Sequence, residues 1–266
     1  MIKKHTLLVD EVNNQIVTWL KTYAENAKVN GFVVGISGGV DSAVTSTLCA
    51  QTGFQVLCVE MPIHQHESHV NRGREHIKQL RNRYPNVSTT TADLTSVFES
   101  FKSVVPSDFE ENKLNITLAN TRARLRMTSL YYFAGVHGLL VAGTGNKVED
   151  FGVGFYTKYG DGGVDLSPIA DLMKSEVFML AAYLKVPDSI LNAAPSDGLF
   201  GDEKTDEAQL GATYDELEWA MIQDQEGKSA TDFSDRKRIV YEIYKRLNKI
   251  NQHKMKNIPV CIVKRD

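Results

Sequence analysis

The residues best suited to chemistry stand together at positions 37–42, which read SGGVDS. Glycine reaches positive φ at little cost and lets the backbone approach a ligand, so Gly38 and Gly39 favour a loop with accessible N–H groups. Such groups, together with the N-terminus of a following helix, form a concave anion site. Ser37 and Ser42 add two hydroxyl donors. The stretch therefore predicts a phosphate-binding loop.

The acid in this loop makes the expected ligand more specific. Asp41 would repel a bare phosphate, whereas a carboxylate and a phosphate can share a Mg²⁺ ion. We therefore expect a site for magnesium pyrophosphate; a simple turn capped by serine or aspartate is the alternative. The stretch is not a Walker loop, because no Gly-Lys-Ser/Thr follows it, and it is not the GxGxxG dinucleotide fingerprint.

The surrounding segments alternate between strand and helix patterns. Short β-rich runs predict strands at 31–37, 54–62, 86–94 and 138–146. Apolar spacing predicts helices at 7–27, 40–53, 66–84, 94–104, 115–137, 168–186, 213–225 and 231–252. This order predicts an α/β fold, a Rossmann-like, doubly wound parallel sheet with helices on both faces. Such sheets bind ligands beyond the carboxyl ends of their strands, where the loop at 37–42 is expected.

Composition narrows the class of protein. The 266 residues are 42% hydrophobic and 24% charged, which suits one domain spanning 1–266. A net charge of -3 argues against a nucleic-acid partner. Cys49, Cys58 and Cys261 form no CxxC pair, so buried thiols in a reducing compartment are expected. Neither a signal peptide nor a membrane span is recognisable, and a cytoplasmic protein is expected.

Several further segments carry a family resemblance. SGGVDS after the first strand resembles the pyrophosphate loop of the N-type ATP pyrophosphatases, which have the adenine nucleotide alpha hydrolase-like fold. LANTRARLRM (118–127), the run 143–177 with its TKYGDGG, APS (194–196) and NQHKMK (251–256) resemble the NAD synthetases in order and spacing. The resemblance covers about residues 30 to 256, and TKYGDGG is its most specific part.

The resemblance implies roles for individual residues. Those expected to bind ATP are Gly35, Ile36, Ser37, Gly38, Gly39, Val40, Asp41, Ser42, Thr144, Lys174 and Ser196. Those expected to bind nicotinic acid adenine dinucleotide (deamido-NAD) are Arg124, Lys158, Asp165, His253 and Lys254. Asp41 and Glu149 are the expected Mg²⁺ ligands, and Asp41 and Lys174 the expected catalytic residues.

Several of these positions have an alternative interpretation. Asp150 could take the place of Glu149, and Arg124 could be a solvated helix charge. His253 and Lys254 could belong to a polar tail beyond a fraying helix. The family often has an acid two positions after the serine of APS, whereas Gly198 stands there in this chain.

The implied reaction is the ATP-dependent amidation of deamido-NAD with ammonia. The nicotinate carboxylate would attack the α-phosphorus of ATP, and ammonia would then displace AMP from the acyl-adenylate to give NAD. Two rivals are a tRNA-modifying pyrophosphatase and a non-catalytic nucleotide-binding module. The acidic balance and the cysteine positions argue against the first, and the combination of Asp41, Glu149 and Lys174 argues against the second.

Two expectations concern larger parts of the chain. Residues 196–216 are poor in apolar side chains, which predicts a mobile surface loop closing over ATP. The helix at 115–137 interleaves three arginines with apolar residues around its circumference, which favours packing on its own sheet and on a partner. A homodimer with deamido-NAD at the interface is expected; the length of the dinucleotide and the distance along the chain from Arg124 to His253 and Lys254 favour a site shared by two subunits.

Overall fold

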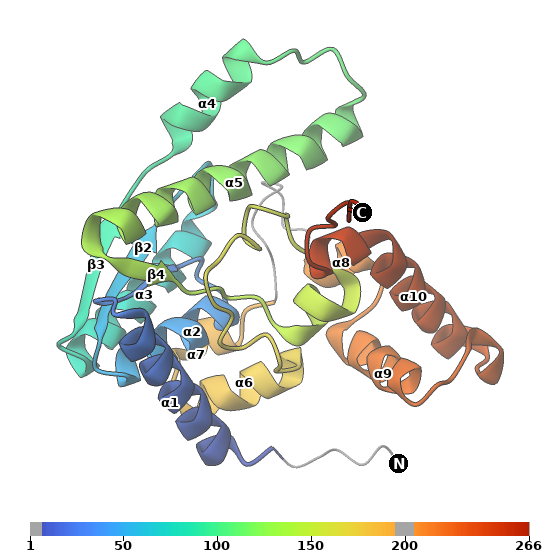
Figure 1. Cartoon of the computed structure of the whole chain (residues 1–266), viewed down its shortest axis with the longest axis horizontal. Coiled ribbons are helices and arrows are strands. Elements are labelled where there is room, and N and C mark those ends of the chain that lie inside the picture. Colours follow the sequence, from blue (N-terminus) through green and yellow to red (C-terminus); the bar gives the residue numbers. More distant parts are fainter. Residues whose placement is uncertain (1–6, 195–204, 266) are drawn as a thin grey trace.

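A four-stranded parallel sheet forms the centre of the protein (Figure 1). The computed structural model describes residues 7–194 and 205–265. The strands lie in the order β3-β2-β1-β4, and their bounds are Val87–Thr91, Gln55–Glu60, Gly31–Gly35 and Leu139–Val141. The chain leaves β1 toward β2 and β3 and returns on its other side as β4, so a switch point lies between β1 and β4. The predicted fold class is confirmed.

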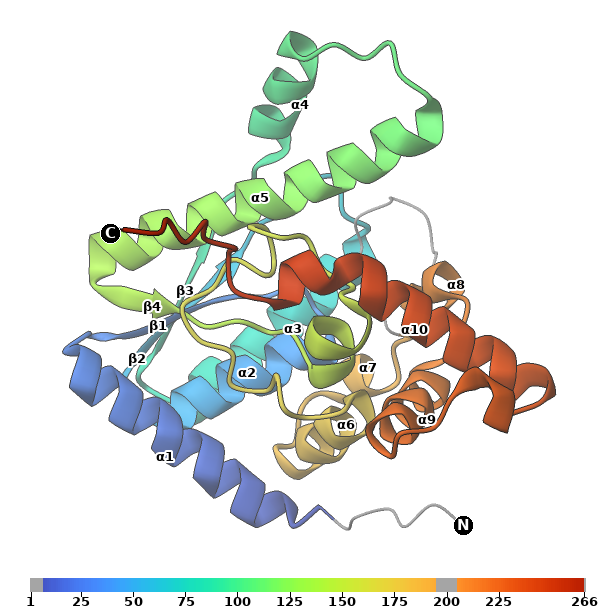
Figure 2. The same cartoon turned by 45° about the vertical axis from the view of Figure 1, so that its right-hand side comes forward.

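Helices cover both faces of this sheet (Figure 2). One face packs on α1 (Val9–Ala27), α2 (Val40–Gln51), α3 (Glu67–Arg83) and α6 (Lys174–Tyr183). The other packs on α5 (Glu111–His137), which follows α4 (Thr95–Val104). Alternation along β1 explains the two layers, because Phe32 and Val34 point to the first and Val33 to the second.

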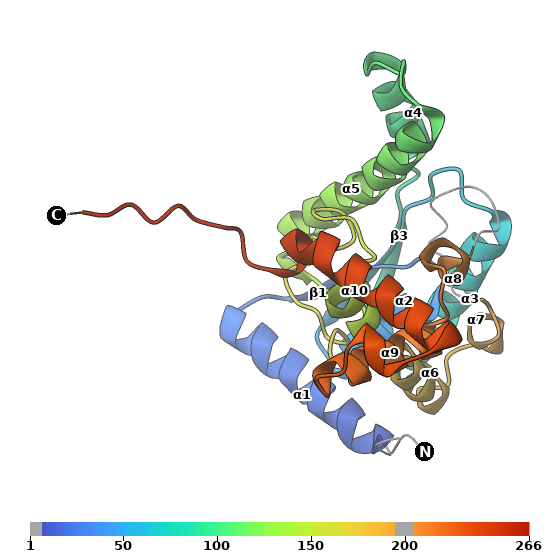
Figure 3. The same cartoon turned by 90° about the vertical axis from the view of Figure 1, so that its right-hand side faces the viewer.

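A second apolar cluster lies beside the sheet (Figure 3). It joins the π-helix η1 (Val148–Val153), α9 (Tyr214–Gln225) and α10 (Asp235–Met255). Three short helices complete the described chain: α7 (Asp188–Leu191), α8 (Asp206–Leu210) and the 3-10 helix η2 (Ala230–Asp232). This cluster positions the carboxyl end of α10 beside the loop that follows η1.

The structure corrects several predicted boundaries. The helix expected at 168–186 begins only at Lys174, after a series of turns, so this lysine starts the helix. The last helix continues to Met255, so His253 and Lys254 lie in its final turn rather than in a polar tail. The loop expected at 196–216 contains α8 and the start of α9, and Thr205 and Thr213 cap the amino ends of these two helices. Leu210 in this segment is buried. Residues 196–204 of that loop lie outside the described residues.

The cysteines agree in part with the sequence expectation. Cys49 and Cys58 are buried free thiols, and burial raises the pKa of Cys58 to about 12. Cys261, in contrast, is exposed on the extended segment after α10. Across residues 7–194 and 205–265, no helix has both the length and the apolar character that crossing a membrane requires.

His76 makes stability dependent on pH. It is buried, and its Nε2 lies 2.8 Å from the Ser46 hydroxyl, which itself donates to the Ser42 carbonyl. The ring therefore donates through Nε2 and is neutral. Burial, and then the charge of Arg83, lower its pKa from 6.5 to about 4.

A depressed pKa contributes stability above the unfolded value that is lost as the pH falls toward the folded value. We expect His76 to lower the free energy of unfolding by about 2 kcal/mol between pH 7.5 and pH 5. Urea unfolding at both values should show this loss in the parent and not in His76→Gln. Equal pH dependence in the two proteins would contradict it.

Candidate active site

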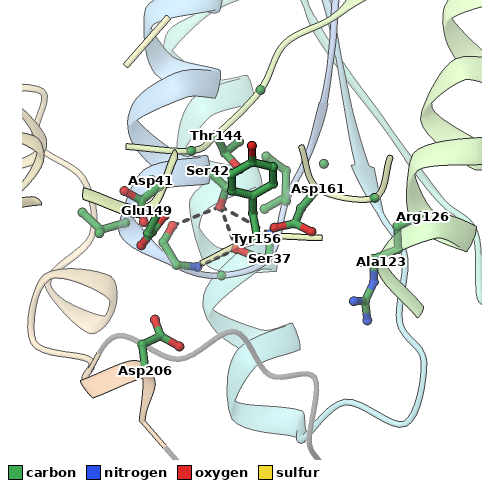
Figure 4. A pocket seen from close by; sticks show the side chains of 18 of the residues that line it. Ser37, Asp41, Ser42, Ala123, Arg126, Thr144, Glu149, Tyr156, Asp161 and Asp206 are labelled. Atoms are coloured by element: carbon green, nitrogen blue, oxygen red, sulfur yellow. Dashed lines mark hydrogen bonds between the residues drawn. The ribbon is translucent and has the colours of Figure 1, made fainter. Parts of the chain in front are cut away.

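A cavity of about 240 Å³ opens at the carboxyl ends of β1 and β4, at the switch point (Figure 4). Its floor is the loop after β1, and its walls come from α5, from the segment after β4 and from the start of α6. The predicted ATP-binding residues among its lining are Gly35, Ile36, Ser37, Gly38, Gly39, Val40, Asp41, Ser42, Thr144 and Lys174. Ser196 lies outside the described residues.

The loop at 37–42 has a conformation that glycine makes possible. Gly38 has φ of +83°, and a Cβ there would lie 2.3 Å from the carbonyl oxygen of His69 on α3. Gly39, in contrast, has φ of -96°, so the prediction that both glycines use positive φ is wrong for Gly39. Gly39 is instead the N-cap of α2 and has no side chain to cover the first N–H groups of that helix.

The two loop serines hold the loop in shape. Their hydroxyl oxygens lie 3.1 Å apart, the Gly39 N–H donates to Ser37 Oγ at 3.2 Å, and Ser42 donates to the Gly39 carbonyl at 3.0 Å. The amino end of α2 therefore faces the cavity as a fixed array of N–H groups. That arrangement suits an anion such as pyrophosphate.

The ammonium group of Lys174 is buried beside this loop. Lys174 Nζ lies 2.6 Å from Asp41 Oδ2 and 3.1 Å from Glu149 Oε1. The lysine side chain is 4% exposed, against 17% for Asp41 and 16% for Glu149. The three predicted residues thus converge from α6, α2 and η1, which are far apart in the sequence.

Electrostatics keep this cluster highly charged. Burial alone would lower the pKa of Lys174, but the adjacent Asp41 and Glu149 carboxylates overcome it and raise the pKa above its ordinary value. Burial also raises the pKa of Asp41, against the opposing effect of the lysine. One ammonium between two carboxylates leaves an excess of negative charge where a further cation would be stabilised.

The donor set fits Mg²⁺. Two carboxylates meet at one point, and Mg²⁺ is commonly bound by one or two carboxylates together with substrate phosphates. In the described part of the chain, no group of three or more His, Cys, Asp or Glu could hold a metal ion by itself. The remaining ligands would therefore come from phosphate and water.

Asn146 links Asp41 to the backbone of the helix that carries Glu149. Its side-chain N–H donates to Asp41 Oδ1 at 3.2 Å, and its Oδ1 accepts from the backbone N–H groups of Val148 and Glu149 at 3.1 and 3.2 Å. It thereby caps the π-helix that carries Glu149 and connects it to the phosphate loop. π-Helical turns are rare in proteins, and those that occur are often found at functional sites.

Most of the predicted deamido-NAD residues lie close together, and Lys254 among them lines the smaller cavity beside the main one. Arg124 donates to the Lys158 carbonyl at 3.4 Å, and Lys158 Nζ donates to the His253 carbonyl. Lys254 Nζ donates to the carbonyls of Gly154 and Tyr156 at 2.7 and 2.6 Å. Arg124 and His253 thus both contact Lys158 within one subunit, because α10 returns to the TKYGDGG segment, so their distance along the chain is no argument for a shared site.

Asp165 forms its side-chain hydrogen bonds with residues other than the predicted deamido-NAD residues. Its carboxylate accepts from the Val141 backbone N–H at 2.8 Å and from the Tyr131 hydroxyl at 3.0 Å. It does not line the cavity and instead joins β4 to α5. These contacts account for an acid at that position without a ligand.

Known proteins similar to this chain agree on one family. The NAD synthase family profile matches residues 12–258. The chain belongs to the NAD synthase family. It is 35% identical over 256 residues to an NH(3)-dependent NAD(+) synthetase of Carboxydothermus hydrogenoformans, covering 94% of this chain and 96% of that protein. It is 39% identical to the protein of the same name from Alkaliphilus metalliredigens, covering 90% and 93%.

Solved structures agree with the fold. An NMN synthetase of Francisella tularensis superposes with a TM-score of 0.83 at 32% identity, covering 95% of this chain and 98% of that one. The NH3-dependent NAD synthetase of Campylobacter jejuni gives a TM-score of 0.76 at 22% identity, covering 96% and 99%.

The cavity of this NAD synthase family member also contains residues that sequence reasoning missed. Arg126, rather than Arg124, projects from α5 toward the cavity, opposite the carboxylates (Figure 4). Asp150 and Asp161 face it from the segment after β4; burial, and then neighbouring carboxylates, raise the pKa of Asp150 to about 8. Burial raises the pKa of Asp161 to about 6. The signal for Asp161 was available, since it lies within TKYGDGG.

Proposed function

We propose that this protein amidates deamido-NAD with ammonia at the expense of ATP, giving NAD, AMP and pyrophosphate. The nicotinate carboxylate oxygen bonds to the α-phosphorus and the bond to pyrophosphate breaks. Ammonia then bonds to the acyl carbon, AMP leaves and a proton is released. The observation that carries the proposal is the convergence of Asp41, Glu149 and Lys174 at the phosphate loop, in a chain of this family.

The chain's own residues mainly position and neutralise charge. The N–H groups at the start of α2 hold the pyrophosphate portion of ATP, and Lys174 places a fixed positive charge beside it. Mg²⁺, held by Asp41 and Glu149, would stabilise negative charge on the phosphates. Holding the two substrates in one orientation supplies much of the remaining acceleration.

The inner acids suit the nitrogen substrate. Asp150 and Asp161 line both the main cavity and a smaller adjoining one of about 160 Å³, beside Lys254. The Asp161 carboxylate would attract ammonium, and the smaller cavity is large enough for it. These contacts support a nitrogen site beside the TKYGDGG segment.

A mononucleotide substrate is the second candidate, because the F. tularensis neighbour at 32% identity is named an NMN synthetase. Comparing kcat/KM for deamido-NAD and for nicotinic acid mononucleotide decides between them. The curated relatives at 35% and 39% identity favour the dinucleotide.

The reaction type is tested by the nucleotide product. Incubation with ATP, Mg²⁺, ammonium and deamido-NAD should release AMP and pyrophosphate in equal amounts with the NAD formed. Omitting deamido-NAD is the control and should abolish turnover. Release of ADP, or equal turnover without deamido-NAD, would exclude the proposed reaction.

We infer that the protein works in the cytoplasm as a homodimer with deamido-NAD near the interface. Support comes from α5, whose apolar side chains are not all used by its own sheet. Tyr132 is 66% exposed and Val136 61% exposed, and Ile116 is exposed on the same helix. Aromatic and aliphatic groups at such exposure favour a contact with a second copy.

Charges on this face should disrupt the dimer. Light scattering is expected to give twice the chain mass for the parent and the single chain mass for the double variant Tyr132→Glu with Val136→Glu. Lys113→Glu, an exposed change in the first turn of the same helix, should leave the mass unchanged. A monomeric, fully active parent would overturn the inference.

A further inference from the structure

Tyr214 connects three parts of the active site and is outside the residues expected from the sequence. It lies at the start of α9 and is 4% exposed. Its hydroxyl lies 2.6 Å from Glu149 Oε1 and 3.2 Å from Asp206 Oδ2. Its ring lies beneath the ammonium of Lys174, with Nζ 4.7 Å from the ring centroid.

These contacts determine how Glu149 is presented. Oε1 of Glu149 accepts from both Tyr214 and Lys174, at 2.6 and 3.1 Å. No hydrogen bond from a described residue reaches Oε2. A carboxylate that accepts two hydrogen bonds through one oxygen has less freedom to rotate, which leaves its other oxygen available to a ligand in the cavity that Glu149 lines.

The hydroxyl needs an explanation that packing does not provide. The ring packs in the apolar cluster of η1, α9 and α10, beside residues such as Leu217 and Val148, where phenylalanine would fit equally well. Burying a hydroxyl costs free energy unless it is hydrogen bonded, and here both of its partners are carboxylates. A phenol carries one proton and a carboxylate oxygen accepts, so the hydroxyl donates to Glu149, whose oxygen is the nearer of the two.

We propose that Tyr214 is a positioning residue for the amidation reaction: its hydroxyl orients Glu149 for the divalent cation, its ring holds Lys174, and Asp206 on α8 offers the hydroxyl a second, more distant acceptor. The inference rests on the proposed function of the site. The ring contact is electrostatic, since an ammonium above an aromatic face is attracted by the ring quadrupole. Partners of this kind around metal ligands commonly change metal affinity by about 10- to 100-fold.

The direct test is Tyr214→Phe, which removes the hydroxyl and keeps the ring. Mn²⁺ binding in the presence of inorganic pyrophosphate, followed by electron paramagnetic resonance, should weaken about 10-fold. kcat should fall while the KM for deamido-NAD stays within about twofold, because the dinucleotide contacts are intact. The matched control is Tyr244→Phe, which removes a phenol of the same cluster that contacts Asp224 rather than the site.

Asp206→Asn tests the same network without changing the tyrosine, and it should weaken Mn²⁺ binding less than Tyr214→Phe does. Mn²⁺ binding that is unchanged in Tyr214→Phe, or weakened equally in Tyr244→Phe, would overturn the proposal. The binding measurement needs neither ATP nor deamido-NAD. A parent that binds Mn²⁺ with pyrophosphate but makes no NAD would therefore refute the proposed function, and the Tyr214→Phe result would still test the role of Tyr214 in cation binding.

Discussion

Replacing Asp41 by asparagine is expected to lower kcat/KM for ATP about a thousandfold, which corresponds to about 4 kcal/mol of transition-state stabilisation. Asparagine has nearly the same shape, and its single side-chain oxygen can accept from Lys174 or from Asn146 but not from both. It lacks the charge that would hold Mg²⁺ beside the pyrophosphate. The variant should therefore fold and bind deamido-NAD while losing the chemical step.

The measurement is steady-state release of pyrophosphate across a range of Mg²⁺ concentrations. Asp171→Asn is the matched control, because Asp171 is a solvent-exposed acid paired with Lys147 outside the cavity. It should retain parental activity. Near-normal turnover of Asp41→Asn at millimolar Mg²⁺ would remove Asp41 from the metal site.

Replacing Lys174 by methionine should affect both stability and activity. The change leaves the carboxylates of Asp41 and Glu149 close together without the ammonium between them. Breaking a buried ion pair in this way typically costs about 3–5 kcal/mol of the free energy of unfolding. Loss of the positive charge beside the phosphates should also lower kcat at least about a hundredfold.

Urea unfolding with and without Mg²⁺ distinguishes this effect from simple loss of packing. Mg²⁺ should restore more stability to Lys174→Met than it adds to the parent, because the cation takes over the charge compensation. Lys147→Met is the control, since its pair with Asp171 is solvent exposed and should contribute about 0–1 kcal/mol. Equal Mg²⁺ effects on the parent and Lys174→Met would contradict this account of the cluster.

Much of the fold could be predicted because its signals are local. Apolar β-rich runs at 31–37 and 54–62 are too short for helices and are separated by helical spacing, which is typical of parallel α/β proteins. The boundaries were less accurate where the chain turns. The helix at Lys174 was placed six residues too early, since Pro168 and the following apolar residues have helix-like spacing but form turns.

Helix α5 shows why the sequence did not indicate which of its arginines lines the cavity. Residues two positions apart on a helix differ by about 200° in direction, so Arg124 and Arg126 point to nearly opposite sides. The apolar residues of this helix are distributed over all its sides, so its sequence does not indicate which side faces the sheet. Arg126 lines the cavity, while Arg124 contacts the Lys158 carbonyl.

The sequence by itself determined the phosphate loop, the order of strands and helices, and the family. These depend on short stretches in which neighbouring residues act together, such as SGGVDS and TKYGDGG. The tertiary structure alone decided which distant side chains meet. Tyr214 contacts Glu149 across 65 positions, and Lys174 contacts Asp41 across 133. Such contacts depend on how α6, α9 and η1 pack against one another. The sequence of one segment does not indicate which other segment it will pack against.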